Sequence, residues 1–288
     1  MRLSIIASLI ALSATSAVAS IDRIVLYADS FSDNGNDYRG SKFPPSPPYW
    51  KGRFSNGPTW AEHVAKAISI PFVNNGHGGA TTNNEDVYSA FNNWTVPGLK
   101  QQVATIKTHG TPKSLYIIEI GYNDLNAIIN PDQYNVVNKH LSKEVIAKNV
   151  VDSVKAIIKK YKAKKFLFMS VPPFDHWPVI QAADKARTNK LITSYNALVT
   201  SELKKKIHGI DLKFIDTHGW FLEQLAHPEN LGLSTSNGPC DWGIGNTTAI
   251  CDDPEKHFFF DSYHPEAKVH KAWGKTALVQ LKQLYNIH

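Results

Sequence analysis

Residues 24–36 read Ile-Val-Leu-Tyr-Ala-Asp-Ser-Phe-Ser-Asp-Asn-Gly-Asn. The run from Ile24 to Tyr27 is short, apolar and rich in strand-forming residues, and it ends in small polar residues, so it predicts a buried strand. Such a strand delivers Ser30 to the rim of a sheet. Because ligands of open α/β sheets bind outside the carboxyl ends of the strands, Ser30 is a candidate nucleophile. The alternative is that Ser30, Ser32 and Asp33 only cap a helix or shape a turn.

The same pattern of strand followed by helix continues along the chain. Strands are predicted at 71–73, 114–120, 165–171 and 212–215, and helices from Pro58 and at 97–107, 142–161, 184–206 and beyond Pro265. Strands that alternate with helices form a parallel sheet with helices on both faces. The predicted fold is therefore α/β, a three-layer α/β/α sandwich with a central parallel sheet.

The N-terminus has the pattern of a secretory signal peptide. Residues 1–19 carry Arg2, an apolar run from Leu3 to Leu12 and the small residues Ala17-Val18-Ala19, which predicts cleavage before Ser20. A membrane anchor is the alternative, but the apolar run is too short to span a bilayer. We therefore expect a signal peptide at 1–19, a single domain at 20–288 and a secreted, extracellular protein.

Two cysteines and two glycosylation sequons fit export. The sequons are Asn93-Trp94-Thr95 and Asn246-Thr247-Thr248, and they gain weight from the signal peptide. In an oxidising compartment Cys240 and Cys251 are expected to form a disulfide. Two cysteines alone cannot make a zinc site, and we expect no metal.

The chain has a formal net charge of +6 over its 288 residues. A cluster of lysines surrounds one predicted helix end: Lys155, Lys159, Lys160, Lys162, Lys164 and Lys165. Cations near a helix C-terminus are typical of a solvated helix face, so no nucleic-acid partner is predicted. Attraction to anionic polymers or lipid headgroups is the alternative.

Acyl transfer at neutral pH needs a nucleophile, an imidazole base and a carboxylate that orients the imidazole. Ser30 would attack, His264 would act as base and then as acid, and Asp261 would hold the imidazole tautomer. Asp261 and His264 are three residues apart around a turn that Pro265 ends, so both side chains can point to one side. A helix N-cap followed by a proline is the alternative interpretation of this segment, and both can hold together.

The developing oxyanion needs hydrogen-bond donors. The backbone N–H groups of Ser30 and Gly79 and the side-chain amide of Asn123 are the candidates, and a glycine lets the backbone approach a substrate closely. The alternatives are a flexible turn around Gly79 and a turn cap at Asn123.

Taken together, these motifs resemble those of the GDSL, or SGNH, hydrolase family of secreted esterases and lipases. Four blocks match in chain order: 28–36 with Ser30, 74–82 with Gly79, Gly121-Tyr122-Asn123-Asp124, and Asp261-Ser262-Tyr263-His264-Pro265. The resemblance implies a flavodoxin-like SGNH-hydrolase fold, with Ser30, Gly79, Asn123 and His264 as the namesake residues and Asp261 completing the triad. It covers nearly the whole chain after residue 19.

One position departs from the family pattern, because Ala28 replaces the first glycine of Gly-Asp-Ser. The added methyl group is harmless at negative φ and costly at positive φ. The α/β-hydrolase motif Gly-x-Ser-x-Gly, the zinc-peptidase motif His-Glu-x-x-His and a phosphate-binding loop with lysine are absent, which argues against those three classes.

The sequence thus predicts a secreted serine ester hydrolase that needs no cofactor, does not insert stably into a membrane and acts as a monomer on a small-molecule or polysaccharide ester. Within the family it most resembles fungal carbohydrate acetylesterases, which implies small acyl groups such as acetyl; lysophospholipase or haemolysin-like esterases are the alternative. Tryptophans could stack on sugar rings, or belong to the core as most tryptophans do: Trp50, Trp60, Trp94, Trp177, Trp220 and Trp242. Apolar residues past Asn123 could line an acyl groove or merely pack a loop: Leu125, Ile128, Ile129, Val136 and Val137. A catalytically silent carbohydrate- or surface-binding protein is a hypothesis of another class.

Overall fold

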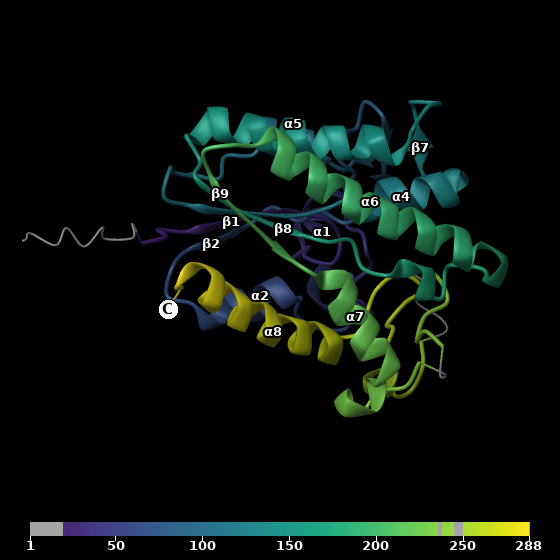
Figure 1. Cartoon of the computed structure of the whole chain (residues 1–288). Helices are drawn as coiled ribbons and strands as arrows, with labels where there is room; N and C mark the ends of the chain where they lie inside the picture. Colours follow the sequence, from purple (N-terminus) through teal and green to yellow (C-terminus); the bar gives the residue numbers. More distant parts are fainter. Residues whose placement is uncertain (1–19, 236–237, 245–249, 288) are drawn as a thin grey trace, which may run out of the picture.

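A parallel sheet of five strands forms the centre of the molecule in a computed structural model that describes residues 20–235, 238–244 and 250–287 (Figure 1). The expected signal peptide and the sequon at Asn246 lie outside these residues. The strand order is β2-β1-β6-β8-β9. The strands are β1 (Ile24–Ala28), β2 (Phe72–Asn74), β6 (Leu115–Glu119), β8 (Lys165–Met169) and β9 (Asp211–Ile215).

Helices cover both faces of the sheet (Figure 1). One face carries α2 (Trp60–Ala67) and α8 (Ala267–Tyr285), and the other carries α3 (Leu99–Thr105), α5 (Lys143–Tyr161) and α6 (Lys185–Lys206). Every residue of β1 and β6 is buried, which explains why both strands are continuous apolar runs rather than alternating ones. The predicted three-layer α/β/α fold is confirmed.

The starts of α2 and α5 follow local capping chemistry. Thr59 and Glu62 form a reciprocal capping box at the start of α2, and the Ser142 hydroxyl accepts the Val145 N–H at the start of α5. These contacts satisfy backbone donors that the first helical turn leaves without partners. Pro58 therefore precedes α2 instead of opening it.

The strand order is of the flavodoxin type, in which the connections leave the sheet in opposite directions from two adjacent strands. Here those strands are β1 and β6, which pair in register from Ile24 with Leu115 to Ala28 with Glu119. A crevice forms at their carboxyl ends. Ser30 and Asn123 follow these two ends directly.

Several short elements were not predicted. They are α1 (Asn36–Ser41), α4 (Tyr122–Ile129), α7 (Thr217–Ala226), the antiparallel pairs β3 (Val87–Tyr88) with β7 (Asn135–Val136) and β4 (Ala90–Phe91) with β5 (Trp94–Thr95), and single 3-10 turns at Trp50–Gly52, Pro131–Gln133, Phe174–His176, Ala182–Asp184, Pro228–Leu231 and Pro254–Lys256. Helix α4 was not predicted because it has only eight residues and its polar side chains, Asn123, Asp124 and Asn126, are buried, whereas a surface helix turns such residues toward solvent.

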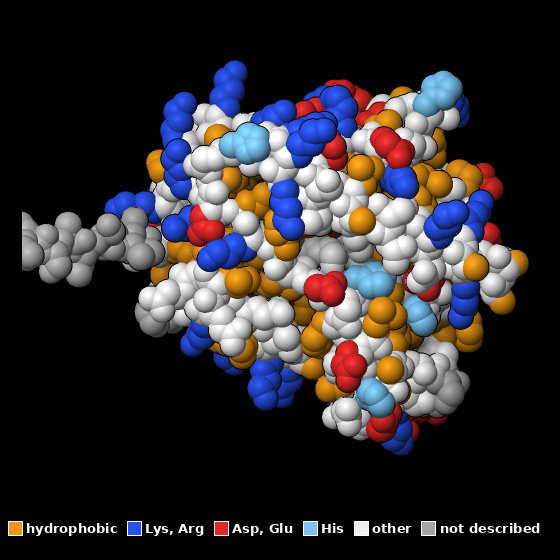
Figure 2. Space-filling view, viewed as in Figure 1, with side chains coloured by type: hydrophobic (Ala, Val, Ile, Leu, Met, Phe, Trp, Pro, Cys, Tyr) orange, Lys and Arg blue, Asp and Glu red, His pale blue; other side chains and the backbone are white. Residues whose placement is uncertain are grey.

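The lysine cluster at the end of α5 lies at the surface. Lys155, Lys159 and Lys160 are exposed, and Figure 2 shows basic side chains beside acidic ones over this helix. This exposure fits a solvated helix face and also the alternative of attraction to anionic polymers. In the described part of the chain, no helix combines the length and the apolar character needed to cross a membrane.

Candidate active site

Ser30 sits in a tight turn just after β1 and is 3% exposed. The carboxylate of Asp33 organises this turn, because its Oδ1 accepts the N–H groups of Gly35 at 2.7 Å and Asn36 at 2.6 Å. Its Oδ2 accepts the N–H of Gly78 at 2.9 Å from the loop after β2. Asp33 thus caps the turn, as one interpretation held, and also fixes the Ser30 loop against the glycine loop.

Ser30, His264 and Asp261 form a continuous line of hydrogen bonds. The Nε2 atom of His264 lies 2.8 Å from the Oγ of Ser30, and its Nδ1 lies 2.8 and 2.9 Å from the two carboxylate oxygens of Asp261. Asp261 is fully buried and His264 is 3% exposed. This arrangement places a base on the serine hydroxyl and a carboxylate behind the base, as proton transfer in acyl transfer requires.

The turn that carries Asp261 and His264 is held by the same carboxylate. Oδ1 of Asp261 accepts the N–H groups of Tyr263 and His264, each at 2.7 Å. The N-cap of α8 is Glu266, so Asp261 does not cap that helix. The Asp261 carboxylate therefore both caps the turn and contacts the imidazole, and the capped turn holds His264 in place beside it.

Gly79 and Asn123 face Ser30 across a small cavity. Gly79 has φ +76°, in the left-handed region, and a Cβ there would lie 2.8 Å from the Cβ of Ser89, so only glycine fits. Asn123 projects from the first turn of α4, and its Nδ2 donates to the Ala80 carbonyl at 2.9 Å. Ala28 lies within β1 and is absent from the positive-φ residues, so its methyl group causes no backbone strain.

The cavity has a volume of about 170 Å³ and combines aromatic walls with amides. Its lining includes Phe54, Phe91, Tyr122, Gln133, Tyr134, Asn135, Ile244 and Tyr263. None of the six tryptophans named above and none of the five apolar residues past Asn123 lines it. Trp60 and Trp177 are core residues, as are Leu125 and Ile129, because the buried helix α4 packs inward. Neither set lines this cavity, and the alternative of packing holds for these four buried residues.

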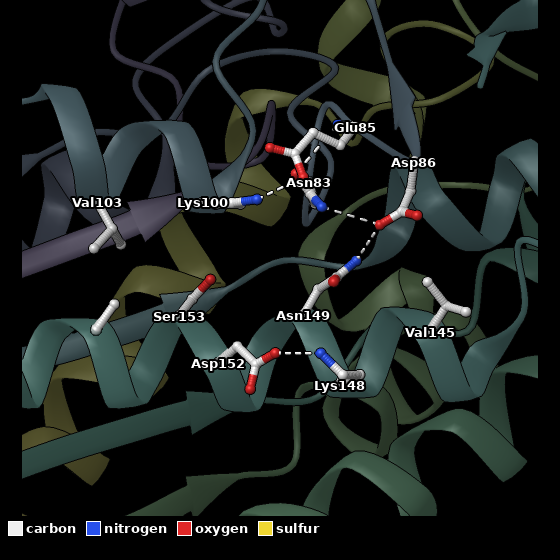
Figure 3. A pocket seen from close by; sticks show the side chains of 11 residues that line it. Asn83, Glu85, Asp86, Lys100, Val103, Val145, Lys148, Asn149, Asp152 and Ser153 are labelled. Carbon is white, nitrogen blue, oxygen red and sulfur yellow. Dashed lines mark hydrogen bonds and ion pairs between the residues drawn. The ribbon is translucent and has the colours of Figure 1, made fainter. Parts of the chain in front are cut away.

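A second cavity of about 430 Å³ lies between α3, α5 and the loop around Asp86 (Figure 3). Its charged and amide side chains are paired with each other: Asn149 donates to Asp86 at 2.9 Å, and Lys100 and Lys148 pair with Glu85 and Asp152. No histidine is among the residues that line it, so it lacks a general base for acyl transfer.

Tyr49 is a site residue that sequence reasoning missed. Its hydroxyl donates to Oδ2 of Asp261 at 2.8 Å and lies 3.4 Å from Oδ2 of Asp241. Tyr49 also packs with Phe260 and Cys240, and Cys240 forms the expected disulfide with Cys251. Tyr49 belongs to a proline-rich loop 212 residues before Asp261, and no motif marks it.

Buried carboxyl groups lie beneath the serine turn. Burial raises the pKa of Asp124 to about 7, although the N–H and hydroxyl of Thr82 donate to it. The pKa of Asp29 is raised mainly by burial and further by the negative charge of Asp124. The pKa of Glu119 is also raised mainly by burial, and further by the negative charge of Asp29. The folded chain therefore holds protons that an unfolded chain releases near pH 4.

These shifts predict that thermal stability falls as pH rises above neutrality. A carboxyl group with a raised folded pKa stabilises the fold at low pH, and this stabilisation is lost as pH rises through that pKa. Burial lowers the pKa of His77 to about 4 and that of His270 to about 3, which acts in the opposite direction below about pH 6.5. Melting temperatures should therefore be compared at pH 6.5 and 8.5.

We expect the wild-type melting temperature to drop across this interval and the drop to be smaller in Asp29→Asn, which cannot ionise. Asp132→Asn, at an exposed position, serves as the matched control with the wild-type slope. A melting temperature that rises from pH 6.5 to 8.5, or equal slopes in Asp29→Asn and wild type, would contradict the prediction.

Comparisons with known proteins agree with this geometry. The family described as GDSL-like lipase/acylhydrolase matches residues 25–277. The chain is 24% identical over 279 residues to the thermolabile hemolysin of Vibrio parahaemolyticus, a match that covers 87% of this chain and 62%, less than two thirds, of the haemolysin. It is 27% identical over 239 residues to the phosphatidylcholine-sterol acyltransferase of Aeromonas hydrophila, covering 78% of this chain and 67% of that protein.

Among solved structures, an acetyl xylan esterase superposes with a TM-score of 0.53 at 10% identity, covering 90% of this chain and 99% of the other. At this identity the likeness concerns the fold alone. The family match extends from β1 to α8 and includes the four sequence blocks and the Ser30–His264–Asp261 line. The chain therefore belongs to the GDSL-like lipase/acylhydrolase family, a family of carboxylic ester hydrolases.

Proposed function

We propose that the protein hydrolyses acyl esters through a covalent acyl-enzyme on Ser30. The observation that carries this proposal is the 2.8 Å contact between the Ser30 hydroxyl and an imidazole whose other nitrogen lies against a buried carboxylate. A hydroxyl becomes a nucleophile at neutral pH when such a base removes its proton. His264, held by Asp261, is in position to do so.

The reaction would proceed in two steps. Ser30 Oγ attacks the ester carbonyl while His264 takes its proton, and the alcohol then leaves with that proton as the acyl-enzyme forms. Water attacks the acyl-enzyme, His264 takes a proton from the water and returns it to Ser30, and the carboxylic acid is released. The oxyanion of each step would accept hydrogen bonds from the backbone N–H groups of Ser30 and Gly79 and from Asn123 Nδ2. No cofactor takes part.

The size of the cavity supports a short acyl group. Its volume of about 170 Å³ is below the range of about 300–1,000 Å³ that encloses drug-sized ligands. An acetyl group fits inside, and the amide and phenol groups at Gln133, Asn135 and Tyr263 suit a hydroxyl-rich alcohol outside it. We therefore propose acetyl groups on carbohydrate as the substrate.

Lipid esters are the second candidate, because the relatives named above include a haemolysin and a phosphatidylcholine-sterol acyltransferase. A screen of p-nitrophenyl acetate, butyrate and octanoate, together with acetylated xylo-oligosaccharide and lysophosphatidylcholine, separates the two. Acetyl specificity predicts the highest kcat/KM for the acetates, whereas a preference for octanoate and lysophosphatidylcholine would favour the lipid candidate. If the protein shows no turnover, or only turnover that a serine-directed phosphonate does not abolish, a silent binding protein is favoured.

We further propose that residues 1–19 are removed on export and that residues 20–288 act as a single secreted domain and a monomer. The disulfide supports an oxidising compartment. The exposure of Asn93 at the tip of the β4–β5 hairpin supports glycosylation at this sequon. N-terminal sequencing of the mature protein, expected to begin at Ser20, tests the cleavage site.

Reduction of the disulfide is expected to lower kcat before the sheet unfolds. The bond stabilises the folded protein by about 2–4 kcal/mol, and Cys240 packs on Tyr49, which donates to Asp261. Loss of the bond should loosen this contact while the parallel sheet stays intact. Esterase activity and far-ultraviolet circular dichroism of reduced protein, compared with a Cys240→Ala/Cys251→Ala double variant, measure the two effects; full activity of the reduced form would contradict the expectation.

A further inference from the structure

Tyr134 lies between Asn123 and a second buried amide, Asn126. The Tyr134 hydroxyl donates to Asn123 Oδ1 at 3.0 Å and accepts from Asn126 Nδ2, also at 3.0 Å. Asn123 and Asn126 are three residues apart on α4, so both project toward the same tyrosine. Tyr134 follows the 3-10 turn at Pro131–Gln133, which returns the chain over the cavity.

The side chains of Asn130, Asn126, Tyr134 and Asn123 form a row of hydrogen bonds in which each donates to the next. Asn130 Nδ2 donates to Asn126 Oδ1 at 2.8 Å, Asn126 donates to Tyr134, and Tyr134 donates to Asn123. A tyrosine hydroxyl has one hydrogen, so accepting from Asn126 directs that hydrogen to Asn123 Oδ1. Burial raises the pKa of Tyr134, so its hydroxyl keeps the hydrogen at working pH.

The row fixes which end of the Asn123 amide faces which neighbour. Oδ1 is held by the Tyr134 hydroxyl, and one Nδ2 hydrogen is held by the Ala80 carbonyl. The other Nδ2 hydrogen is left for a ligand in the cavity that Asn123 shares with Ser30. A flipped amide would set Oδ1 against the Ala80 carbonyl and would present an acceptor where an oxyanion needs a donor.

We propose that Tyr134 is a positioning residue of the oxyanion hole, which holds the Asn123 amide with its donor end toward the reacting carbonyl. This inference rests on the proposed ester hydrolysis. The oxyanion exists only in the tetrahedral intermediates and the transition states that lead to them, so the effect of Tyr134 falls on kcat. Donation into Oδ1 also polarises the amide and strengthens Nδ2 as a donor.

A double-mutant cycle tests the proposal, because a residue that acts through Asn123 has no effect on kcat once the Asn123 amide is removed. Asn123→Ala is expected to lower kcat by about 100- to 1,000-fold, and Tyr134→Phe, which keeps the ring, by about tenfold with KM unchanged. In the Asn123→Ala background, Tyr134→Phe should change kcat by less than about twofold. Tyr116→Phe is the matched control, since it removes a hydroxyl that donates to the Thr111 carbonyl at 3.0 Å, remote from the cavity.

Three results would overturn the proposal: an unchanged kcat in Tyr134→Phe, an equal loss in both backgrounds, or a raised KM at constant kcat, which would make Tyr134 a substrate contact. If Tyr134→Phe does not fold, Asn126→Leu removes the amide that orients the Tyr134 hydrogen and is expected to show a kcat loss that likewise vanishes in Asn123→Ala. A wild-type protein without esterase activity would instead refute the proposed function, so the two failures are distinct.

Discussion

Ser30→Ala is expected to lower kcat by about 10⁵- to 10⁶-fold and to leave the fold intact. The change removes the oxygen atom that His264 Nε2 contacts at 2.8 Å, and among the described residues no other hydroxyl is hydrogen-bonded to that imidazole. The loss of stability should be small, because the turn around Ser30 is held by the Asp33 carboxylate and not by the Ser30 side chain. Initial rates on p-nitrophenyl acetate and melting curves measure both effects.

Ser194→Ala is the control for this variant. The Ser194 hydroxyl donates to the Leu191 carbonyl on α6 and does not line the cavity, so wild-type rates are expected. Purified Ser30→Ala with wild-type activity would show that another residue is the nucleophile.

Asp261→Asn is expected to lower kcat by about 10⁴-fold with little change in KM. In the wild type, both carboxylate oxygens lie within 2.9 Å of His264 Nδ1, which keeps the hydrogen on Nδ1 and the lone pair of Nε2 directed at Ser30. An asparagine amide can donate to Nδ1, which puts the hydrogen on Nε2 and removes the base. The backbone turn should persist, because an asparagine Oδ1 still accepts the N–H groups of Tyr263 and His264.

Asp241→Asn is the matched comparison, since Asp241 is also fully buried and lies beside the Tyr49 hydroxyl, but it does not contact the imidazole. We expect this variant to lose far less activity than Asp261→Asn. Equal losses would mean that the carboxylates act on the stability of the loop and not on the tautomer of His264.

The sequence predicted those parts of the site in which a short run of residues determines the local backbone. The buried runs of β1 and β6 are uniformly apolar, and each ends in small polar residues, so the crevice and Ser30 could be placed at the strand ends. Gly79 could be identified from its glycine-rich loop and its place in the second block of the family resemblance, and its left-handed backbone beside Ser89 explains why a glycine stands there. Asp261 and His264 are close in sequence, so a local turn was enough to bring them together.

The rest of the site depends on long-range contacts that no local pattern encodes. Tyr49 reaches Asp261 from a proline-rich loop, and Tyr134 reaches Asn123 only because α4 turns the chain back over the cavity. Helix α4 is itself almost fully buried, and its apolar residues were mistaken for a groove lining. Each of these positions is set by packing between elements rather than by the residues beside it in the chain.

The most direct test of the account is the site of covalent modification by a serine-directed phosphonate. Trypsin should release residues 24–39, which follow Arg23, end at Arg39 and contain Ser30 and Ser32. Fragment-ion mass spectrometry is expected to place the phosphonate on Ser30, with labelling strongly reduced in His264→Ala because the base is missing. An adduct on Ser32 or on a different peptide, or equal labelling rates in His264→Ala and wild type, would contradict the assignment of Ser30 and His264 as nucleophile and base.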